Sequence, residues 1–371
     1  MAKLERNKKL DARILELEEE LRTTKYNKRT QGAVGLLKAK IARLKEAQRS
    51  RASKGSKSTG YNVRKSGDAT VILVGFPSVG KSTLLNSLTG TNSPVGSYAF
   101  TTLDVIPGLL QYKHAKIQIL DVPGIIQGAA SGKGRGKEVL SVATNADLVL
   151  ILVDVFHPEH LDIVKKEVYD ANIRLNKTKP IVKIAKKSKG GISIGATVKL
   201  THLDKKTAEN ILREYKIVNA DVVIRSDVTV DDFIDAIEGN KRYIPGIVVL
   251  NKIDMVTPHQ LEQVKKTVNP DICISADKKE HLEELKELIF KKLNFIRVYC
   301  KEIGKPADLD VPMIMFKGST LKDMCQKLHK DFVSKFRFAR VWGDSVKFDG
   351  QKVLKLSHEL KDNDIIEIHV S

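Results

Sequence analysis

The stretch Gly75-Phe-Pro-Ser-Val-Gly80-Lys81-Ser82 follows an apolar run at residues 70–75 (TVILVG) and precedes a helix-like pattern at residues 82–88. It matches GxxxxGK[ST], in which glycines let backbone N–H groups wrap phosphate oxygens at the start of a helix. Lys81 is expected to reach the β and γ phosphates, and the Ser82 hydroxyl to ligate Mg²⁺. A chance match in a loop is the weaker interpretation, because strand and helix flank the motif in the required order. The residues predicted to bind the nucleotide here are Gly75, Pro77, Ser78, Val79, Gly80, Lys81, Ser82 and Thr83.

A second motif, Asp121-Val-Pro-Gly124, begins at the end of a strand-like run at residues 117–121. A carboxylate at this place can hold Mg²⁺, often through water, while the Gly124 N–H can meet the γ-phosphate. Between the two motifs lie Thr101 and Thr102, and either hydroxyl can close over the metal until hydrolysis releases it; we favour Thr102. The predicted metal ligands are Ser82, Thr102 and Asp121, and the predicted catalytic residues are Lys81, Thr102 and Gly124.

A third motif, Asn251-Lys-Ile-Asp254, decides the base and follows an apolar run at residues 246–251. The Asp254 carboxylate can accept hydrogen bonds from guanine N1–H and N2–H₂, a pairing that adenine does not offer. A buried acceptor left unpaired costs about 1–3 kcal/mol, so this motif disfavours ATP. Because the NKID motif follows the first two motifs in this order along the chain, the three together predict that the nucleotide is GTP or GDP.

Four further residues are expected to complete the base site. Asn251 is predicted to fix the loop, and the stem of Lys252 to lie along the ring face. The next apolar run ends in Ser275-Ala276, where a backbone N–H can donate to guanine O6. The predicted base-binding residues are therefore Asn251, Lys252, Asp254, Ser275 and Ala276.

Hydrolysis is expected to be slow without a stimulator. The residue after Gly124 is Ile125, where Ras-type enzymes carry the Gln that orients the attacking water. Help can come from a cation, a reordered loop or a partner, and a K⁺ requirement is our hypothesis for the first of these. Arg135, in the Gly-rich stretch after Gly124, is either a cis arginine finger or a solvated loop residue.

The apolar runs predict the main fold. Further runs at residues 147–155 and 271–275 alternate with helical patterns, which indicates a parallel sheet covered by helices on both faces. We therefore predict an α/β domain of the P-loop GTPase type in two parts, residues 66–169 and residues 238–293.

Two other segments interrupt or extend this domain. Residues 170–237 break the alternation and are predicted to form an inserted α+β subdomain, whose Lys-rich residues 183–189 are either an RNA-phosphate contact or a solubilising loop. The tail, residues 294–371, shows two strand-like runs, a helix at residues 321–335 and further strands, which is the β-grasp order. Its aromatic residues are expected to form a core rather than to stack on RNA bases. These residues are Phe336, Phe338 and Trp342.

The formal net charge is +19, and most of it lies at the N-terminus, since residues 1–65 contain 19 Lys or Arg and 7 Asp or Glu. Two apolar stripes at helical spacing predict an antiparallel helical hairpin with its turn near residues 27–32, followed by a basic linker. The stripes are Leu10, Ile14, Leu17 and Leu21, and Val34, Leu37, Ile41 and Leu44. Such a charge excess favours a polyanionic partner, and RNA binding through it is expected to weaken with salt.

Composition excludes several other classes of protein. In a chain of 371 residues, 42% apolar residues are enough to build cores. Three scattered cysteines without a CxxC pair support neither a disulfide framework nor a zinc site, and we expect them to be buried small residues. The longest apolar runs are far too short to cross a bilayer, and the N-terminus is too charged for a signal peptide. We expect a cytoplasmic, monomeric protein without a membrane partner.

The ordered set GFPSVGKS, YAFTT, DVPG with GKGRG, NKID and SA resembles the Obg-related GTPases, and more closely the developmentally regulated GTP-binding proteins of archaea and eukaryotes. The resemblance covers essentially the whole chain, and the tail with FARVWGDSVKF resembles a TGS domain. It implies GTP hydrolysis with Mg²⁺, ribosome association and a role in translation. It also implies that the insertion resembles a domain of a small-subunit ribosomal protein and that eukaryotic members bind a zinc-finger regulatory partner. K⁺-stimulated relatives often carry Asn where this chain has Ser78.

Two functions from different classes remain in competition. The first is a GTPase that hydrolyses GTP to GDP and phosphate as a conformational switch on the ribosome. The second is a non-enzymatic RNA- or ribosome-binding scaffold that uses GTP as a structural ligand, which Ile125 favours. A related ATPase is a third interpretation, and Asp254 disfavours it.

Overall fold

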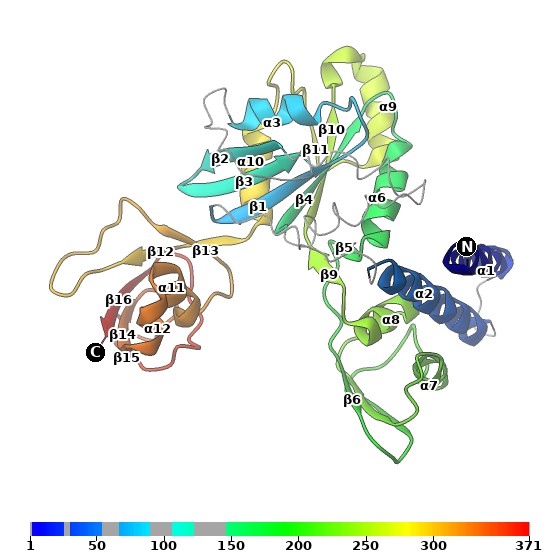
Figure 1. Ribbon diagram of the computed structural model, residues 1–371. Helices are drawn as coiled ribbons and strands as arrows, with labels where there is room; N and C mark the ends of the chain where they lie inside the picture. Colours follow the sequence, from blue (N-terminus) through cyan, green and yellow to red (C-terminus); the bar gives the residue numbers. More distant parts are fainter. Residues whose placement is uncertain (1, 26–29, 54–66, 90–105, 122–145, 371) are drawn as a thin grey trace. The chain divides into compact units, whose positions relative to one another are not determined.

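The structure, a computed structural model, describes residues 2–25, 30–53, 67–89, 106–121 and 146–370 (Figure 1). The chain divides into two compact units. One unit comprises Met1–Tyr61 and Lys177–Tyr243, and the other comprises Asn62–Asn176 and Ile244–Ser371. Among the described residues, no helix combines the length and the apolar character needed to span a membrane.

The second unit contains a six-stranded sheet in the order β11-β10-β4-β1-β3-β2 (Figure 1). Its strands are β1 (Ala69–Val74), β2 (Ile106–Tyr112), β3 (Ala115–Asp121), β4 (Leu148–Asp154), β10 (Gly246–Asn251) and β11 (Ile272–Cys273). Five strands run parallel, as the apolar runs predicted. Every residue of β1 and β4 is buried, because helices cover both faces and leave no side for polar residues.

Strand β2 was not predicted from the sequence. It pairs antiparallel with β3 at the edge of the sheet. The two-residue turn between them is Lys113-His114, with both residues at positive φ (47° and 67°). Such turns usually carry Asn-Gly or Asp-Gly, so the turn gave no recognisable hairpin pattern.

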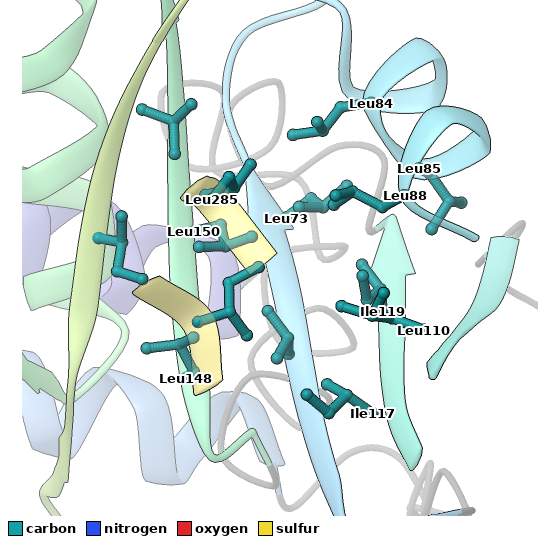
Figure 2. Packing of buried hydrophobic residues seen from close by; sticks show 14 of the residues in the cluster. Leu73, Leu84, Leu85, Leu88, Leu110, Ile117, Ile119, Leu148, Leu150 and Leu285 are labelled. Atoms are coloured by element: carbon teal, nitrogen blue, oxygen red, sulfur yellow. The ribbon is translucent and has the colours of Figure 1, made fainter. Parts of the chain in front are cut away.

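Helices α3 (Lys81–Thr89) and α10 (Leu282–Lys292) pack in one core cluster on the sheet, and α6 (His160–Asp170) and α9 (Pro258–Val268) pack in another. Figure 2 shows the first cluster, in which side chains of α3 gather with those of the central strands. Its labelled members include Leu73, Leu84, Leu85, Leu88, Leu148, Leu150 and Leu285. This packing fixes the helix that begins at Lys81 against the strand that ends at Val74.

Replacing Leu150 by Ala is expected to lower the free energy of unfolding by about 2–5 kcal/mol, because it leaves a cavity beside well-packed neighbours. Leu150 lies in the central strand β4 and is fully buried. Denaturant unfolding followed by circular dichroism measures the change. Ile163→Ala, at a position in α6 that is 45% exposed, is the control and should change stability by less than about 0.5 kcal/mol. Equal losses in the two variants would contradict this assignment of the core.

The first unit begins with the helical hairpin, α1 (Ala2–Thr23) and α2 (Gln31–Ser53). The predicted seam is confirmed, since Leu17, Leu37 and Ile41 form a buried cluster with Leu21 and Leu44 against it. Lys45 Nζ lies 2.8 Å from Glu18 Oε1, and Gln48 donates to Asp11, so the helices run antiparallel. Of the predicted turn, residues 26–29 lie outside the described residues, as does the linker at residues 54–60.

The insertion packs against this hairpin. Its three-stranded sheet has the order β6-β8-β7, formed by β6 (Val182–Lys186), β7 (Ile192–Ala196) and β8 (Ala220–Ile224), and its helices are α7 (Lys205–Glu214) and α8 (Val230–Glu238). Ala39 of α2 belongs to the same buried cluster as Phe233 of α8. Lys38 Nζ is also 2.7 Å from Asp231 Oδ2. Hairpin and insertion therefore form one unit rather than two separate ones.

The limits of the insertion differ from residues 170–237. The unit begins at Lys177 and ends at Tyr243, and the chain enters and leaves it at β5 (Ile173–Leu175) and β9 (Arg242–Ile244). Ile173 belongs to the core cluster of the large sheet, which is why the boundary lies after it.

The tail forms a five-stranded sheet in the order β13-β12-β16-β14-β15 with helices α11 (Leu321–Leu328) and α12 (Lys330–Ser334). The strands are β12 (Phe295–Cys300), β13 (Met313–Phe316), β14 (Phe336–Trp342), β15 (Gln351–Val353) and β16 (Asp364–Val370). The predicted single helix is split at His329, whose backbone is extended (φ −163°, ψ 142°). The short strand β15 was not predicted.

Two expectations about side chains were wrong. Phe338 and Trp342 are only partly buried and do not belong to the core of the tail, whereas Phe336 packs against it. The cysteines also differ from one another, since Cys325 is buried, Cys273 is half-buried and Cys300 is exposed. Cys300 is the last residue of β12, at the end of its ladder with β16.

Candidate nucleotide-binding site

The loop between β1 and α3 requires glycine at two places. A Cβ on Gly75 would lie 2.5 Å from the carbonyl oxygen of Leu152 in the neighbouring strand. Gly80 has φ +95°, and a Cβ there would lie 2.4 Å from Asn251 Nδ2. Val79, between them, is 1% exposed and anchors the loop in the core. The loop is therefore held close to the strand ends, with its backbone leading into the N-terminus of α3.

Lys81, the first residue of α3, lies across this loop. Its Nζ donates to the carbonyl oxygens of Gly75 (3.0 Å) and Phe76 (2.9 Å). Burial lowers the pKa of Lys81, and the negative charge of Asp121 opposes that shift. The two carbonyl bonds hold the ammonium at the mouth of the loop, where phosphate oxygens would meet it.

Ser82, in the first turn of α3, meets Asp121 at the carboxyl end of β3. Ser82 Oγ donates to Asp121 Oδ2 at 2.9 Å, and Asp121 is 4% exposed. Its other oxygen, Oδ1, is buried and has no hydrogen-bond partner within the described part of the chain. Buried polar atoms are rarely left unpaired, and a hydroxyl beside a carboxylate suits the hard oxygen ligation of Mg²⁺. These two residues therefore fit the metal that the sequence predicted.

The other residues predicted on the phosphate side lie outside the described residues. They are Thr101, Thr102, Gly124, Ile125 and Arg135. The choice between the two threonines and the role of the arginine stay predictions.

Asn251, at the end of β10, joins two loops of the site. Its Nδ2 donates to the carbonyl oxygen of Val79 (2.8 Å), and its Oδ1 accepts the N–H of Ala276 (3.0 Å). The side chain is 2% exposed, so both bonds are shielded from water. Asn251 thus connects the loop before α3 with the loop after β11.

The N–H groups at Ser275 and Ala276 are already hydrogen-bonded within the protein. Ser275 N–H donates to the carbonyl oxygen of Glu280 at 3.3 Å, and Ala276 N–H donates to Asn251. Contact of either group with guanine O6 would need a shared hydrogen bond. That contact stays a prediction.

Asp254 lies in the single turn η1 (Ile253–Met255) that follows β10. It is half-buried, and Lys278 Nζ lies 4.0 Å from its Oδ2. Lys252 precedes it in the left-handed region (φ +66°). The arrangement brings the carboxylate to the same edge of the sheet as the phosphate loop.

The sequence motifs missed Asp154, the last residue of β4. Its Oδ1 accepts the N–H groups of Phe156 (3.2 Å) and His157 (3.0 Å), and its Oδ2 lies 3.3 Å from Lys252 Nζ. The side chain is 6% exposed. The sequence could have indicated Asp154, because it is an acidic residue at the end of a buried parallel strand. The other motifs of the site also lie at such strand ends. Asp154 is a positioning residue for Lys252.

Replacing Asp154 by Asn is expected to weaken GDP binding about three- to tenfold. A hydrogen bond to a charged group is worth about 1.5–3 kcal/mol, and only part of that is lost here because the 3.3 Å contact acts on the nucleotide through Lys252. Titration with a fluorescent GDP analogue measures the affinity. Asp162→Asn, the same change at an exposed position in α6, is the control. Unchanged GDP affinity in the Asp154 variant would remove the positioning role.

Three family models cover nearly all of the chain from residue 70 onward. They are described as 50S ribosome-binding GTPase (residues 70–187), C-terminal region of MMR_HSR1 domain (residues 189–295) and TGS domain (residues 296–370). Developmentally-regulated G-protein 3 of Arabidopsis thaliana is 46% identical over 96% of this chain and 97% of that protein. The chain belongs to the developmentally regulated GTP-binding proteins. Its GTPase domain and its TGS domain, both expected from the sequence, are thereby confirmed.

Two further relatives are similar to this chain over most of their length. Developmentally-regulated GTP-binding protein 2 of Homo sapiens is 43% identical over 96% of this chain and 98% of that protein. Uncharacterized GTP-binding protein MJ1326 of Methanocaldococcus jannaschii is 53% identical over 97% of this chain and 92% of that protein. Among solved structures, a GTP binding protein from Pyrococcus horikoshii OT3 is similar with 15% identity and a TM-score of 0.42, over 81% of this chain and 100% of that chain.

Proposed function

We propose that this protein hydrolyses GTP to GDP and phosphate as a conformational switch. The observation that carries the proposal is the pairing of Ser82 with Asp121, whose second carboxylate oxygen is buried and unpaired. Recognition of the guanine base needs only the Asn251 side of the site. A hydroxyl and a carboxylate placed beside the phosphate loop are the parts that also serve phosphoryl transfer.

The chain's own residues divide the work of the site. Lys81 exchanges its two carbonyl partners for β- and γ-phosphate oxygens, and the N–H groups of the loop surround the phosphates. Ser82 and Asp121 would hold Mg²⁺, which when bound neutralises charge that develops on the phosphates. Thr102 and Gly124 complete the γ-phosphate side in this proposal. Catalysis then rests on positioning and electrostatic stabilisation of an in-line water attack.

Hydrolysis by the protein alone is expected to be slow because Ile125 occupies the position after Gly124. A K⁺ ion is our proposed source of additional positive charge at the γ-phosphate. Turnover should therefore be faster in K⁺ buffer than in Na⁺ buffer of the same ionic strength. Equal turnover in the two buffers would count against a K⁺ requirement.

We further propose that the switch controls association with the ribosome during translation. The family model described as a ribosome-binding GTPase supports this proposal, as does the basic charge of residues 1–65. A cytoplasmic, monomeric protein fits the same proposal, and a zinc-finger regulatory partner belongs to it if the source is eukaryotic.

Single-turnover hydrolysis of radiolabelled GTP, with and without ribosomes, tests the enzymatic proposal against the scaffold. A switch should release phosphate, and ribosomes should change its rate. A scaffold that uses GTP as a structural ligand should bind GTP and leave it intact in both conditions. Ser82→Asn serves as the inactive reference, because it removes the predicted metal ligand.

A further inference from the structure

Strand β14 of the TGS domain presents two different faces. Ala339 and Val341 are fully buried in the core beneath α11. Side chains alternate along a strand, so Phe338, Arg340 and Trp342 lie on the opposite face. Phe338 and Trp342 are half-buried there, and Arg340 is exposed. The aromatic rings therefore lie on the surface of the sheet that faces away from the helix.

Neighbouring strands add basic and aromatic groups to this face. Lys352 of β15 lies opposite Arg340 in the ladder, and its Nζ is 4.2 Å from the Phe338 ring centroid. His369 of β16 stacks on Phe338 with ring centroids 4.1 Å apart and an interplanar angle of 15°. Lys301 Nζ lies 4.9 Å from the Trp342 ring centroid. We call Phe338, Arg340, Trp342 and Lys352 the aromatic face.

The acidic residue on this face is already neutralised. Glu367 forms a close ion pair with Lys301 and a hydrogen bond with His369, and these contacts hold its pKa below the ordinary value. Arg340 and Lys352 are exposed and, within the described part of the chain, form no ion pair. The aromatic face therefore carries an uncompensated positive charge next to its rings.

We propose that the aromatic face binds single-stranded RNA by base stacking. Rings and cations that alternate on an exposed sheet suit unpaired bases and their phosphates, since every base offers a face for stacking. A base that takes the place of the Lys352 ammonium over Phe338 would let that ammonium reach the adjoining phosphate. A paired duplex buries its base faces and leaves the rings unused. This inference rests on the proposed association with the ribosome and assigns one contact within it.

Trp342 is the single tryptophan of the chain, so tryptophan fluorescence of the full-length protein, excited at a wavelength that the tyrosines do not absorb, reports on this face alone. A single-stranded oligonucleotide of about ten nucleotides should quench this emission in a saturable way. A duplex of the same length, heparin and poly-glutamate should quench it far less. Saturable quenching by poly-glutamate but not by RNA would overturn the proposal in favour of an acidic protein partner. No quenching by RNA that binds the protein would also overturn it.

Two variants test which groups carry the affinity, measured by anisotropy of labelled RNA. Phe338→Leu should weaken RNA binding about tenfold. Phe338→Tyr, which keeps the aromatic ring, should retain most of the wild-type affinity. Arg340→Gln should weaken binding about threefold and reduce the slope of affinity against salt by about 0.7. Lys322→Gln, the matched charge change at an exposed position of α11, is the control. RNA affinity of Phe338→Leu equal to wild type would overturn the proposal.

A separate measurement keeps this proposal distinct from the wider one. If ribosome pelleting in the GTP state survives while both RNA tests fail, only the aromatic face is refuted. If the protein does not pellet with ribosomes but RNA quenches Trp342 fluorescence, the stacking contact is supported and the proposed association with the ribosome is refuted.

Discussion

Replacing Asp254 by Asn is expected to lower GTP affinity by about two to four orders of magnitude and to raise affinity for xanthosine nucleotides. Asp254 is half-buried at the start of the loop after β10, where its carboxylate would accept two hydrogen bonds from guanine. Hydrogen bonds to a charged group are worth about 1.5–3 kcal/mol each. The asparagine amide would place an N–H against guanine N2–H₂, a clash of donors, whereas xanthine offers a carbonyl oxygen there.

Competition of GTP, ATP and XTP against a fluorescent GDP analogue measures this change in base preference. Asp277→Asn is the charge-matched control, since Asp277 is exposed in the neighbouring loop after β11. The control should bind GTP like the wild-type protein. Full GTP selectivity in the Asp254 variant would refute the assignment of the base site.

The second large effect is expected at Ser82. Ser82→Asn removes the hydroxyl that donates to Asp121, and it places a larger side chain where the metal would bind. Loss of a group that only supports a metal ligand typically lowers metal affinity about 10- to 100-fold, and Ser82 is itself a predicted ligand. We therefore expect Mg²⁺ to stop strengthening GTP binding, so that GTP dissociation becomes fast whether or not Mg²⁺ is present.

Dissociation of a fluorescent GTP analogue, with Mg²⁺ and with a chelator, measures the role of Ser82. Wild-type protein should release the analogue much faster in the chelator. Asn86→Ser, at an exposed position of the same helix, should behave like wild type. A Ser82 variant that keeps the full response to Mg²⁺ would show that the metal is held elsewhere.

The sheet and the edge that carries the site were predictable because the relevant signals are local. Strand β4 is apolar on both faces, as burial between two layers of helices demands. The motifs that begin at Gly75, Asp121 and Asn251 each follow such a strand. Carboxyl ends of parallel strands share one edge, so strand assignment alone brings these motifs together.

The missed features depend on contacts between distant parts of the chain. Asp154 acts through Lys252, and the residues next to each of them in the sequence do not indicate that the two side chains form a pair. The hairpin and the insertion are joined where Ala39 of α2 packs in one buried cluster with residues of α8. The apolar stripes of the hairpin helices do not indicate this contact. Phe338 and Trp342 were assigned to the core because aromatic residues usually are, yet a register irregularity near Phe336 sets which residues of β14 face outward.

Ribosome co-sedimentation in two nucleotide states tests the central claim most directly. Full-length protein would be mixed with ribosomes and a non-hydrolysable GTP analogue or GDP, then pelleted at low and at high salt. The proposed switch predicts pelleting with the GTP analogue, much less with GDP, and a steep loss with rising salt. Equal pelleting in both nucleotide states would contradict a switch that controls ribosome association.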